Sequence, residues 1–398
     1  MSLTVTTSDL RPTDPELVAT VADLVPRLRE LAPVGEQRRW LDDESVALLG
    51  DAGLWRATVP KRFGGLDLPL ADQIELLTHV GRADGSLAWV ATLWLANAWV
   101  ATLFPDAAQE EIFAEGDTRV SGIFQPTGTL TPTSGGYLLS GSWKWNTGCR
   151  GAQWDGLGAL LATGDGPPEV YYCMIPASEL TIEDDWHAFA ASSTGSSEVR
   201  VADVFVPAHR VIPMAQAIDG TTGDRSNAGA TGRNYPFFGM IMGNALGAFL
   251  GMAEGAYELF LRRLPGRGIT YTPWTDQSAS PVTHIQVATA ANEIDAAKAL
   301  TVHVVDVLQE AADRGVLPPI AQRAALRGNC AYIAELCRQA VQQLYQASGA
   351  SVIMRDVPFQ RVYRDIQGLS QHAAMALNSN LEVHGRVEVG LDPATPFI

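Results

Sequence analysis

Hydrophobic and polar positions follow three different patterns along the chain and divide it into three zones. In residues 1–118, apolar residues recur at helical intervals. In residues 119–213, short runs rich in Val, Trp, Tyr and Thr are separated by Gly and Pro, which is typical of short strands. In residues 214–398, helical periodicity returns after a Gly-, Thr- and Asn-rich linker, Gly220–Gly232. The pattern predicts an N-terminal helical domain, a β domain and a C-terminal helical domain with these bounds.

Local signals within the zones agree with this division. The run Pro15–Val25 has helical spacing, and Asp14 before Pro15 is a predicted helix N-cap. Ser134–Gly136 is a predicted turn between two strands, and Val199–Val206 shows part of the alternation of a half-buried strand.

The first predicted helix of the third zone carries glycine at every fourth position. Each glycine inside a helix costs about 1 kcal/mol relative to alanine, so something must compensate for the stripe. Close approach of another helix or of a flat ligand would do so, and the two do not exclude each other. The glycines are Gly239, Gly243, Gly247, Gly251 and Gly255.

The uncharged segment Ser86–Phe104 is almost long enough to cross a bilayer. It contains Asn97 and two threonines, and Asp84 and Asp106 flank it. We therefore expect a helix buried inside a large helical domain and not a membrane span.

Composition narrows the classes of function. The 398 residues are 46% hydrophobic, which is ample for several packed units, and the net charge of −16 disfavours nucleic-acid and anionic-membrane partners. The first ten residues lack the pattern of a signal peptide, so a cytoplasmic protein with reduced thiols is expected. The four cysteines show no Cys-x-x-Cys spacing: Cys149, Cys173, Cys330 and Cys337.

Four stretches resemble, in the correct order, motifs of the acyl-CoA dehydrogenase fold. They are Leu54–Gly65 with its Pro-x-x-x-Gly-Gly turn, Ser140–Gly148, Thr194–Pro207 and Tyr345–Ser351. The resemblance implies a mainly α fold with an N-terminal helical domain, a central β-barrel and a C-terminal four-helix bundle. It also implies a homotetramer in which a neighbouring subunit completes the flavin site.

The stretch Val362–Met375 resembles the late helical segment of that fold, where an Arg-Asp pair precedes the region that closes over the flavin. Counted from Arg364, the glutamate base of common acyl-CoA dehydrogenases falls on Ala373, and no carboxylate follows until Glu382. A histidine, His372, stands next to that position. This pattern resembles the flavin-dependent monooxygenases that share the fold.

The monooxygenase resemblance implies the oxygenase half of a two-component system. A separate NAD(P)H:flavin reductase would supply reduced FAD or FMN, which combines with O2 to form a C4a-hydroperoxide and hydroxylates the substrate. The Trp- and Phe-rich segments favour an aromatic or polycyclic small molecule, including indole-type or phenolic intermediates of specialised metabolism such as antibiotic biosynthesis. The sequence has no dinucleotide-binding fingerprint, in agreement with a partner reductase.

The resemblance implies roles residue by residue. His372, on a late helix, would handle the substrate's proton, Thr147 would hydrogen-bond near flavin N5, and Asn97 stands where phenol-hydroxylating relatives have a second histidine. By themselves the residues favour a core position for Trp145 and leave Thr147 and Arg263 open as an ordinary strand-end threonine and a solvated arginine. No metal site is expected. Further implied flavin-binding positions are Gln125, Thr127, Trp145, Gly148, Thr194, Gly195, Arg263, Ser348 and Gly349.

Three alternatives remain open at this point. The same oxygen chemistry could act on the nitrogen of an amino sugar. The chain could instead be an acyl-CoA dehydrogenase whose base is on an earlier helix, with Glu254 and Glu258 as candidates. A non-catalytic helical assembly protein would use the glycine stripe for oligomerisation alone.

Overall fold

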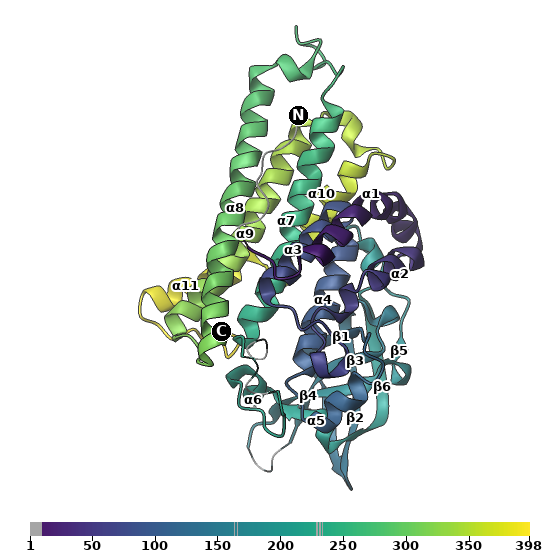
Figure 1. Cartoon of the computed structure of the whole chain (residues 1–398), viewed down its shortest axis with the longest axis vertical. Coiled ribbons are helices and arrows are strands. Elements are labelled where there is room, and N and C mark those ends of the chain that lie inside the picture. The colour runs from purple at the N-terminus through teal and green to yellow at the C-terminus, as the bar shows by residue number, and fades with distance from the viewer. Residues whose placement is uncertain (1–9, 163, 165, 228–229, 231, 233) are drawn as a thin grey trace.

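A computed structural model describes residues 10–398 except 163, 165, 228–229, 231 and 233. The expectation for the N-terminal ten residues therefore lies almost wholly outside the described part. Helices precede and follow one sheet in the chain (Figure 1). The first helices are α1 (Pro15–Arg38), α2 (Asp43–Asp51), α3 (Leu70–Ala83), α4 (Gly85–Ala101) and α5 (Asp106–Ile112). The later ones are α6 (Met214–Asp219), α7 (Phe237–Arg263), α8 (Pro281–Arg314), α9 (Ile320–Ala347), α10 (Pro358–Leu369) and α11 (Leu377–Glu388).

The N-terminal helices form where the pattern predicts them. The Asp14 side chain accepts a hydrogen bond from the Leu17 N–H at 3.0 Å, which confirms the N-cap of α1. Helix α4 is buried along its whole length apart from Leu93, so the expectation of a buried helix for Ser86–Phe104 is confirmed. Helix α7 has the length and composition of a membrane span, but 78% of its most apolar window is buried inside the molecule, as in the core helices of soluble proteins.

The strands form one seven-stranded sheet in the order β5-β6-β2-β1-β3-β4-β7. The predicted turn at Ser134–Gly136 joins β1 to β2, and β1 runs parallel to β3 with an irregularity between Ile123 and Gly128. The predicted closed barrel is wrong for the described residues, because the sheet is open, with β5 and β7 at its edges. These edge strands have only two and three residues, too few to pair with each other along a barrel seam. The strands are β1 (Val120–Thr133), β2 (Gly136–Asn146), β3 (Trp154–Leu161), β4 (Glu169–Pro176), β5 (Thr181–Ile182), β6 (Ser197–Pro207) and β7 (Val211–Pro213).

Four of the five stripe glycines of α7 lie against α3, and Gly239 lies against Leu308 of α8. A Cβ at Gly247 would come within 2.5 Å of the Ile74 carbonyl oxygen, and one at Gly251 would come within 2.2 Å of that of Thr78. Such distances leave no room for any side chain, so close helix packing is confirmed as the reason for these glycines. The long helices α7, α8 and α9 form the upper part of the molecule, with the sheet below them (Figure 1).

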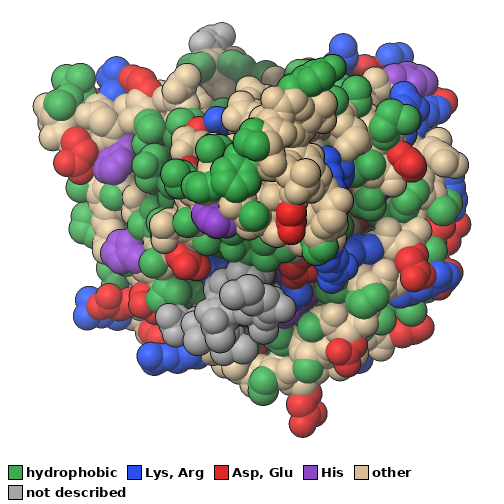
Figure 2. Space-filling model, turned by 90° about the horizontal axis from the view of Figure 1, so that it is seen from above, with side chains coloured by type: hydrophobic (Ala, Val, Ile, Leu, Met, Phe, Trp, Pro, Cys, Tyr) green, Lys and Arg blue, Asp and Glu red, His purple; other side chains and the backbone are tan. Residues whose placement is uncertain are grey.

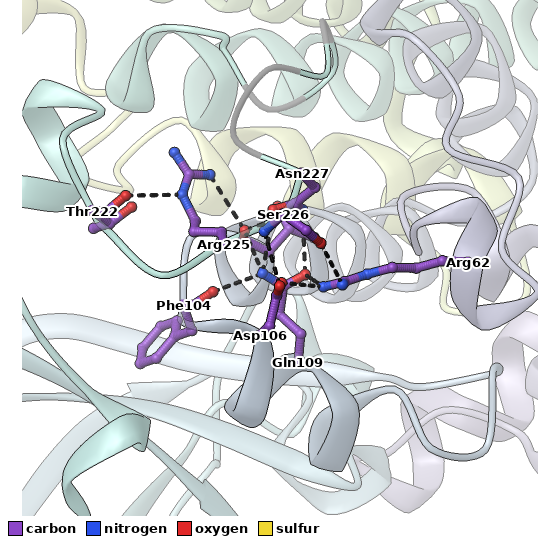
Figure 3. A network of polar contacts seen from close by, with 9 residues as sticks. Arg62, Phe104, Asp106, Gln109, Thr222, Arg225, Ser226 and Asn227 are labelled. Atoms are coloured by element: carbon purple, nitrogen blue, oxygen red, sulfur yellow. Dashed lines mark hydrogen bonds and ion pairs between the residues drawn. The ribbon is translucent and has the colours of Figure 1, made fainter.

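The segment that crosses from the sheet to α7 is held by a polar network (Figure 3). Arg62 contacts Asp106 at 2.6 Å and the Ser226 hydroxyl at 2.7 Å, while the other Asp106 oxygen accepts from the Ser226 N–H at 2.9 Å. Arg225 is buried and its guanidinium donates to the Thr222 and Thr102 carbonyls. The network ties this crossover to α5 and to the turn that precedes α3.

One buried hydrophobic cluster includes residues from all three predicted zones, such as Phe104, Tyr172 and Phe249. The described helices of the first zone end at Ile112, the strands run from Val120 to Pro213, and α6 begins at Met214. The domain bounds themselves stay a prediction. All four cysteines are buried and free.

Candidate active site

His372 lies in the turn between α10 and α11 and not on a helix, so the predicted late-helix position is wrong. Helix α10 ends at Leu369, and His372 Nδ1 accepts from the Ala374 N–H at 3.3 Å. The Trp89 ring from α4 meets the imidazole edge-on, with 5.0 Å between the centroids. His372 has solvent-exposed surface, yet the surrounding protein lowers its pKa to about 4 through desolvation. A pKa this low makes the imidazole neutral at neutral pH.

The helices beside His372 supply aromatic walls. Trp89 packs against Phe249 of α7 with 6.3 Å between ring centroids, and Trp99 packs against Phe237 at 6.2 Å. Phe124 of β1 lies 5.3 Å from the Phe237 ring. The seam between α4 and α7 is therefore apolar at both ends, and these rings keep water out of it.

Asn97 is not brought to His372. It is buried, its amide donates to the Leu93 carbonyl at 2.9 Å, and its carbonyl oxygen accepts from the Tyr172 hydroxyl at 3.1 Å. These bonds tie α4 to β4. The catalytic role implied for Asn97 stays a prediction, and the geometry gives the residue a structural task.

Thr147 is the first member of a buried chain of hydroxyl groups. Thr147 Oγ1 lies 2.8 Å from Ser196 Oγ, which lies 2.7 Å from Thr194 Oγ1. The Thr194 hydroxyl donates to the Ala191 carbonyl at 2.9 Å. A hydroxyl has one hydrogen, so Ser196 must donate to Thr194 and Thr147 must donate to Ser196. What Thr147 can offer a ligand is therefore a lone pair, which accepts a hydrogen bond.

Two glycines beside this chain are fixed by close approach. Gly148 has φ +80°, and a Cβ there would lie 2.5 Å from Trp94 Nε1. Gly195 has φ +53°, and a Cβ there would lie 2.7 Å from Trp40. The Gly148 N–H also donates to the Thr194 carbonyl at 3.3 Å. The structure thus brings together the predicted residues Thr147, Gly148, Thr194 and Gly195.

The predicted core position of Trp145 is wrong, because its side chain is 65% exposed. The register of β2 against β6 shifts between Trp143 and Asn146, and Trp145 adopts φ +64° there, which turns the ring outward. Gln125 and Thr127 are also exposed, in the irregular part of β1, and Thr127 donates to the Ser142 carbonyl at 2.7 Å.

The predicted positions Arg263, Ser348 and Gly349 meet at the far end of α7. Arg263 and Arg267 each donate to the Ser351 hydroxyl at 3.1 Å, and Arg267 also donates to the Ser348 carbonyl at 2.8 Å. Arg263 Nη1 is buried and has no partner. Burial and the neighbouring Arg267 lower the pKa of Arg263, which means that they destabilise its charged form. An anion bound at this end of the bundle would stabilise that charge. Figure 1 shows the C-terminal end of α7 away from the sheet, so this cluster and Thr147 are two separate parts.

Sequence reasoning missed two supporting residues. Ser196 is the centre of the hydroxyl chain, and the run of Thr and Ser from 192 to 197 was the signal that could have identified it. Asp365 accepts from the Ala191 N–H at 2.7 Å and from the Ser86 hydroxyl at 3.0 Å, joining α10, α4 and the turn that carries Thr194. Burial, followed by nearby Asp84, raises the pKa of Asp365 to about 7.

Glu254 and Glu258, the candidates for a relocated base, are both ion-paired. Glu254 pairs with Lys298, and Glu258 contacts Arg82 and Arg29, each at 2.6 Å. Burial alone would raise the pKa of Glu258, but the two arginines outweigh it and lower the pKa. These carboxylates border a charged cavity of about 160 Å³ and are held by cations, which argues against a role as a free base.

The fold and the site define an acyl-CoA dehydrogenase-like enzyme with histidine near the position of the usual glutamate. The family model "Acyl-CoA dehydrogenase, C-terminal domain" matches residues 245–377. The oxygenase subunit HsaA of a flavin-dependent monooxygenase from Mycobacterium tuberculosis is 30% identical over 96% of this chain and 97% of its own, and the HsaA crystal structure superposes with a TM-score of 0.89 over 96% and 99%.

Two further relatives are similar over nearly their whole lengths. The oxygenase component of FADH2-dependent resorcinol hydroxylase from Rhizobium sp. is 29% identical over 95% of both chains. XiaF from Streptomyces sp., solved with FADH2 and glycerol, is 29% identical over 96% of this chain and 97% of its own, with a TM-score of 0.89. The chain belongs to the flavin-dependent monooxygenase oxygenase subunits of the acyl-CoA dehydrogenase fold, and it is a reduced-flavin-dependent oxidoreductase.

The described residues fit a reduced flavin. N5 of a reduced flavin carries a hydrogen, and Thr147 offers an acceptor to such a donor. The unpaired Nη1 of Arg263 suits a flavin phosphate. When bound, reduced flavin supplies two electrons and activates O2.

Proposed function

We propose that this chain is the oxygenase component of a two-component system that hydroxylates an aromatic small molecule. A separate NAD(P)H:flavin reductase would deliver the reduced FAD or FMN, as the words "oxygenase subunit" and "oxygenase component" in the relatives' names imply. One oxygen atom of O2 enters the substrate as a hydroxyl group and the other leaves as water. The reduced flavin supplies the two electrons and leaves oxidised, through the C4a-hydroperoxide that the family resemblance implies. The cytoplasm, where NAD(P)H is available, is the proposed location.

The observation that carries the proposal is the neutral His372 imidazole beside the aromatic seam of α4 and α7. Its pKa of about 4 keeps the ring neutral at neutral pH. Because Nδ1 accepts from the Ala374 N–H, Nε2 carries the hydrogen and can donate it to the oxygen of a phenol. The Trp89 edge fixes one side of the imidazole. Relatives named for resorcinol and for indole-3-acetate agree with an aromatic substrate.

The remaining site residues receive roles in the same proposal. Thr147 accepts a hydrogen bond from N5–H of the reduced flavin, and the backbone turns at Gly148 and Gly195 hold the hydroxyl chain in place. Residues of β1 and β2 contact the flavin from the sheet side. They are Gln125 and Thr127 on β1 and the exposed Trp145 on β2. Arg263, with Ser348 and Gly349, binds the flavin phosphate of a neighbouring subunit in a homotetramer.

The alternatives fit less well. An amino sugar presents many hydroxyl groups, whereas Trp89, Phe249, Trp99 and Phe237 give an apolar wall. An acyl-CoA dehydrogenase needs a free carboxylate, and the two candidates are ion-paired. A purely structural assembly protein would not need the features that fit a reduced flavin.

The test is transfer of labelled oxygen. The protein, reduced FAD or FMN and a panel of phenols and indoles are mixed with ¹⁸O2, and the products are analysed by mass spectrometry. We expect one ¹⁸O atom in the organic product. Complete flavin reoxidation that yields only hydrogen peroxide with every aromatic compound would contradict the proposal, and bleaching of oxidised flavin by acyl-CoA would support the dehydrogenase alternative.

A further inference from the structure

The seam between α4 and α7 contains a polar pair whose hydrogen-bonding capacity is not met. Thr92 and Asn244 are 2% and 0% exposed. The Asn244 amide makes only a long hydrogen bond, 3.4 Å, to the Thr92 carbonyl. Asn244 Oδ1 and Thr92 Oγ1 have no partner. A buried polar group without a partner is costly, so a pair of them indicates a partner from outside the chain.

The pair lies beside the site already described. Contacts join Gly85 to Met252, Trp89 to Phe249, Thr92 to Asn244 and Trp99 to Phe237, so the two helices run antiparallel. Thr92 is three residues after Trp89, which places it on the same side of α4 and roughly 4.5 Å further along the helix. Trp89 is the residue that touches His372. The pair and the imidazole therefore stand at neighbouring levels of one seam.

Partly exposed residues occur near this level of the seam. Leu93, next to Thr92, is the one residue of α4 that keeps exposed surface, and Phe124 of β1 is also only partly buried. His372 is exposed at the Trp89 level. A guest beside these residues would meet aromatic and aliphatic side chains and the two polar atoms of Thr92 and Asn244.

We infer that Thr92 and Asn244 bind a neutral hydroxyl or ring N–H group of the aromatic substrate, at the end remote from the atom that faces His372. Asn244 Oδ1 accepts a hydrogen bond, and the Thr92 hydroxyl can donate or accept one. Neither side chain is charged, so a carboxylate at this point would lose its hydration without gaining a counter-ion. This inference rests on the proposed function, because it specifies the substrate class for the same site.

The experiment compares two probes that differ by one hydroxyl group, 2-naphthol and 2,6-dihydroxynaphthalene. Their affinities for the full chain loaded with reduced FAD are measured by anaerobic calorimetry, so that no turnover occurs. We expect the wild-type protein to bind the diol about tenfold more tightly, the effect of one satisfied buried hydrogen-bonding pair. In Asn244→Leu and Thr92→Val the preference should fall to within about twofold of unity, with 2-naphthol affinity retained.

Controls separate binding from stability. Thr301→Val removes another buried threonine hydroxyl, which already donates to the Ala297 carbonyl at 2.8 Å, and should leave the preference unchanged. A merely structural pair would give variants with a higher melting temperature and the wild-type preference, which would overturn the inference, as would equal wild-type affinities. If labelled oxygen enters neither naphthol while the preference still depends on the pair, the proposed function fails and the binding site stands.

Discussion

At the residue scale, His372 should control how much of the consumed oxygen reaches the substrate. Its imidazole has one backbone contact and one ring contact, so His372→Ala should change the free energy of unfolding by less than about 1 kcal/mol. Without this hydrogen-bonding group, we expect product yield per O2 to fall at least tenfold while peroxide rises. Yield and peroxide are measured together, with His303→Ala on the exposed face of α8 as the control. Wild-type yield in His372→Ala would remove the assigned role.

The pH profile gives an independent check on the same residue. Desolvation lowers the pKa of His372 from 6.5 to about 4, so the imidazole stays neutral as pH falls until it reaches that region. Coupling should therefore remain constant from pH 7 downward and decline as pH falls through about 4. The corresponding contribution to stability is fully present above the unfolded pKa of 6.5 and is lost as pH falls from there through about 4.

The hydroxyl chain makes a second residue-scale prediction. Because Thr194 donates to Ala191, Thr147 is left as an acceptor, which suits N5–H of reduced flavin better than the N5 lone pair of oxidised flavin. Ser196→Ala frees the Thr147 hydrogen, and the preference for reduced over oxidised flavin should fall about fivefold, the value of roughly one hydrogen bond. Dissociation constants for both redox states measure it, with Thr131→Val, an exposed threonine further along β1, as the matched control. An unchanged ratio would show that Thr147 does not face N5.

Residue-scale prediction from sequence succeeded where a motif fixed a backbone turn and failed where a side chain could turn either way. Thr147 and Thr194 lie within quoted motifs, and the structure joins them through Ser196. Trp145 was expected in the core because it is apolar, but a register shift in β2 turned it outward. The hydrophobic pattern of one strand does not predict such a register shift, because the shift depends on how many residues of the partner strand pair with it.

At the element scale, Asp365 fastens three elements together and makes their attachment depend on pH. Its raised pKa of about 7 lies above the unfolded value, so the protonated form stabilises the fold. This stabilisation is complete below about pH 4 and is lost as pH rises through 7. Asparagine can accept from Ala191 and donate to Ser86, so Asp365→Asn imitates the protonated form.

Chemical denaturation between pH 5 and 8 tests this pH-dependent stabilisation by Asp365. Asp365→Asn should exceed the wild type in unfolding free energy by roughly 2–4 kcal/mol at pH 8, and the two should converge towards low pH. The control is Asp306→Asn on the exposed face of α8. Parallel pH profiles for the wild type and Asp365→Asn would show that Asp365 is not the titrating group.

The sequence predicted the helices and strands better than it predicted whether the sheet closes or where a helix ends. Periodicity and the Asp14 cap predicted α1, and the spacing of glycines in α7 anticipated its packing on α3. Barrel closure depends on whether two edge strands meet, and no local pattern reports that. The end of α10 was also missed, because Gln371, Ala373 and Ala374 permit a helix, whereas the helix ends at Leu369.

At the scale of the whole molecule, charge and apolar surface bear on assembly. On the face seen from above, acidic and basic side chains are interspersed with hydrophobic ones, so the negative net charge does not form one continuous patch there (Figure 2). The connection between α7 and α8 exposes Tyr271 and Trp274, and α8 begins with exposed Val282 and Ile285. Exposed apolar groups close in sequence to the Arg263 cluster are typical of a subunit contact.

The proposed sharing of the flavin site between subunits can be tested by complementation. One chain carries Arg263→Ala with Arg267→Ala, and a second, differently tagged chain carries His372→Ala. If the arginines serve a neighbouring subunit, a mixed pair contains one intact site, built from the His372 of the first chain and the arginines of the second. Co-expression should then restore roughly a quarter of wild-type activity from two inactive variants, since about half of the pairs are mixed and each has one intact site. If the arginines act within their own chain, no mixture restores activity, because every site then lacks either the arginines or the histidine.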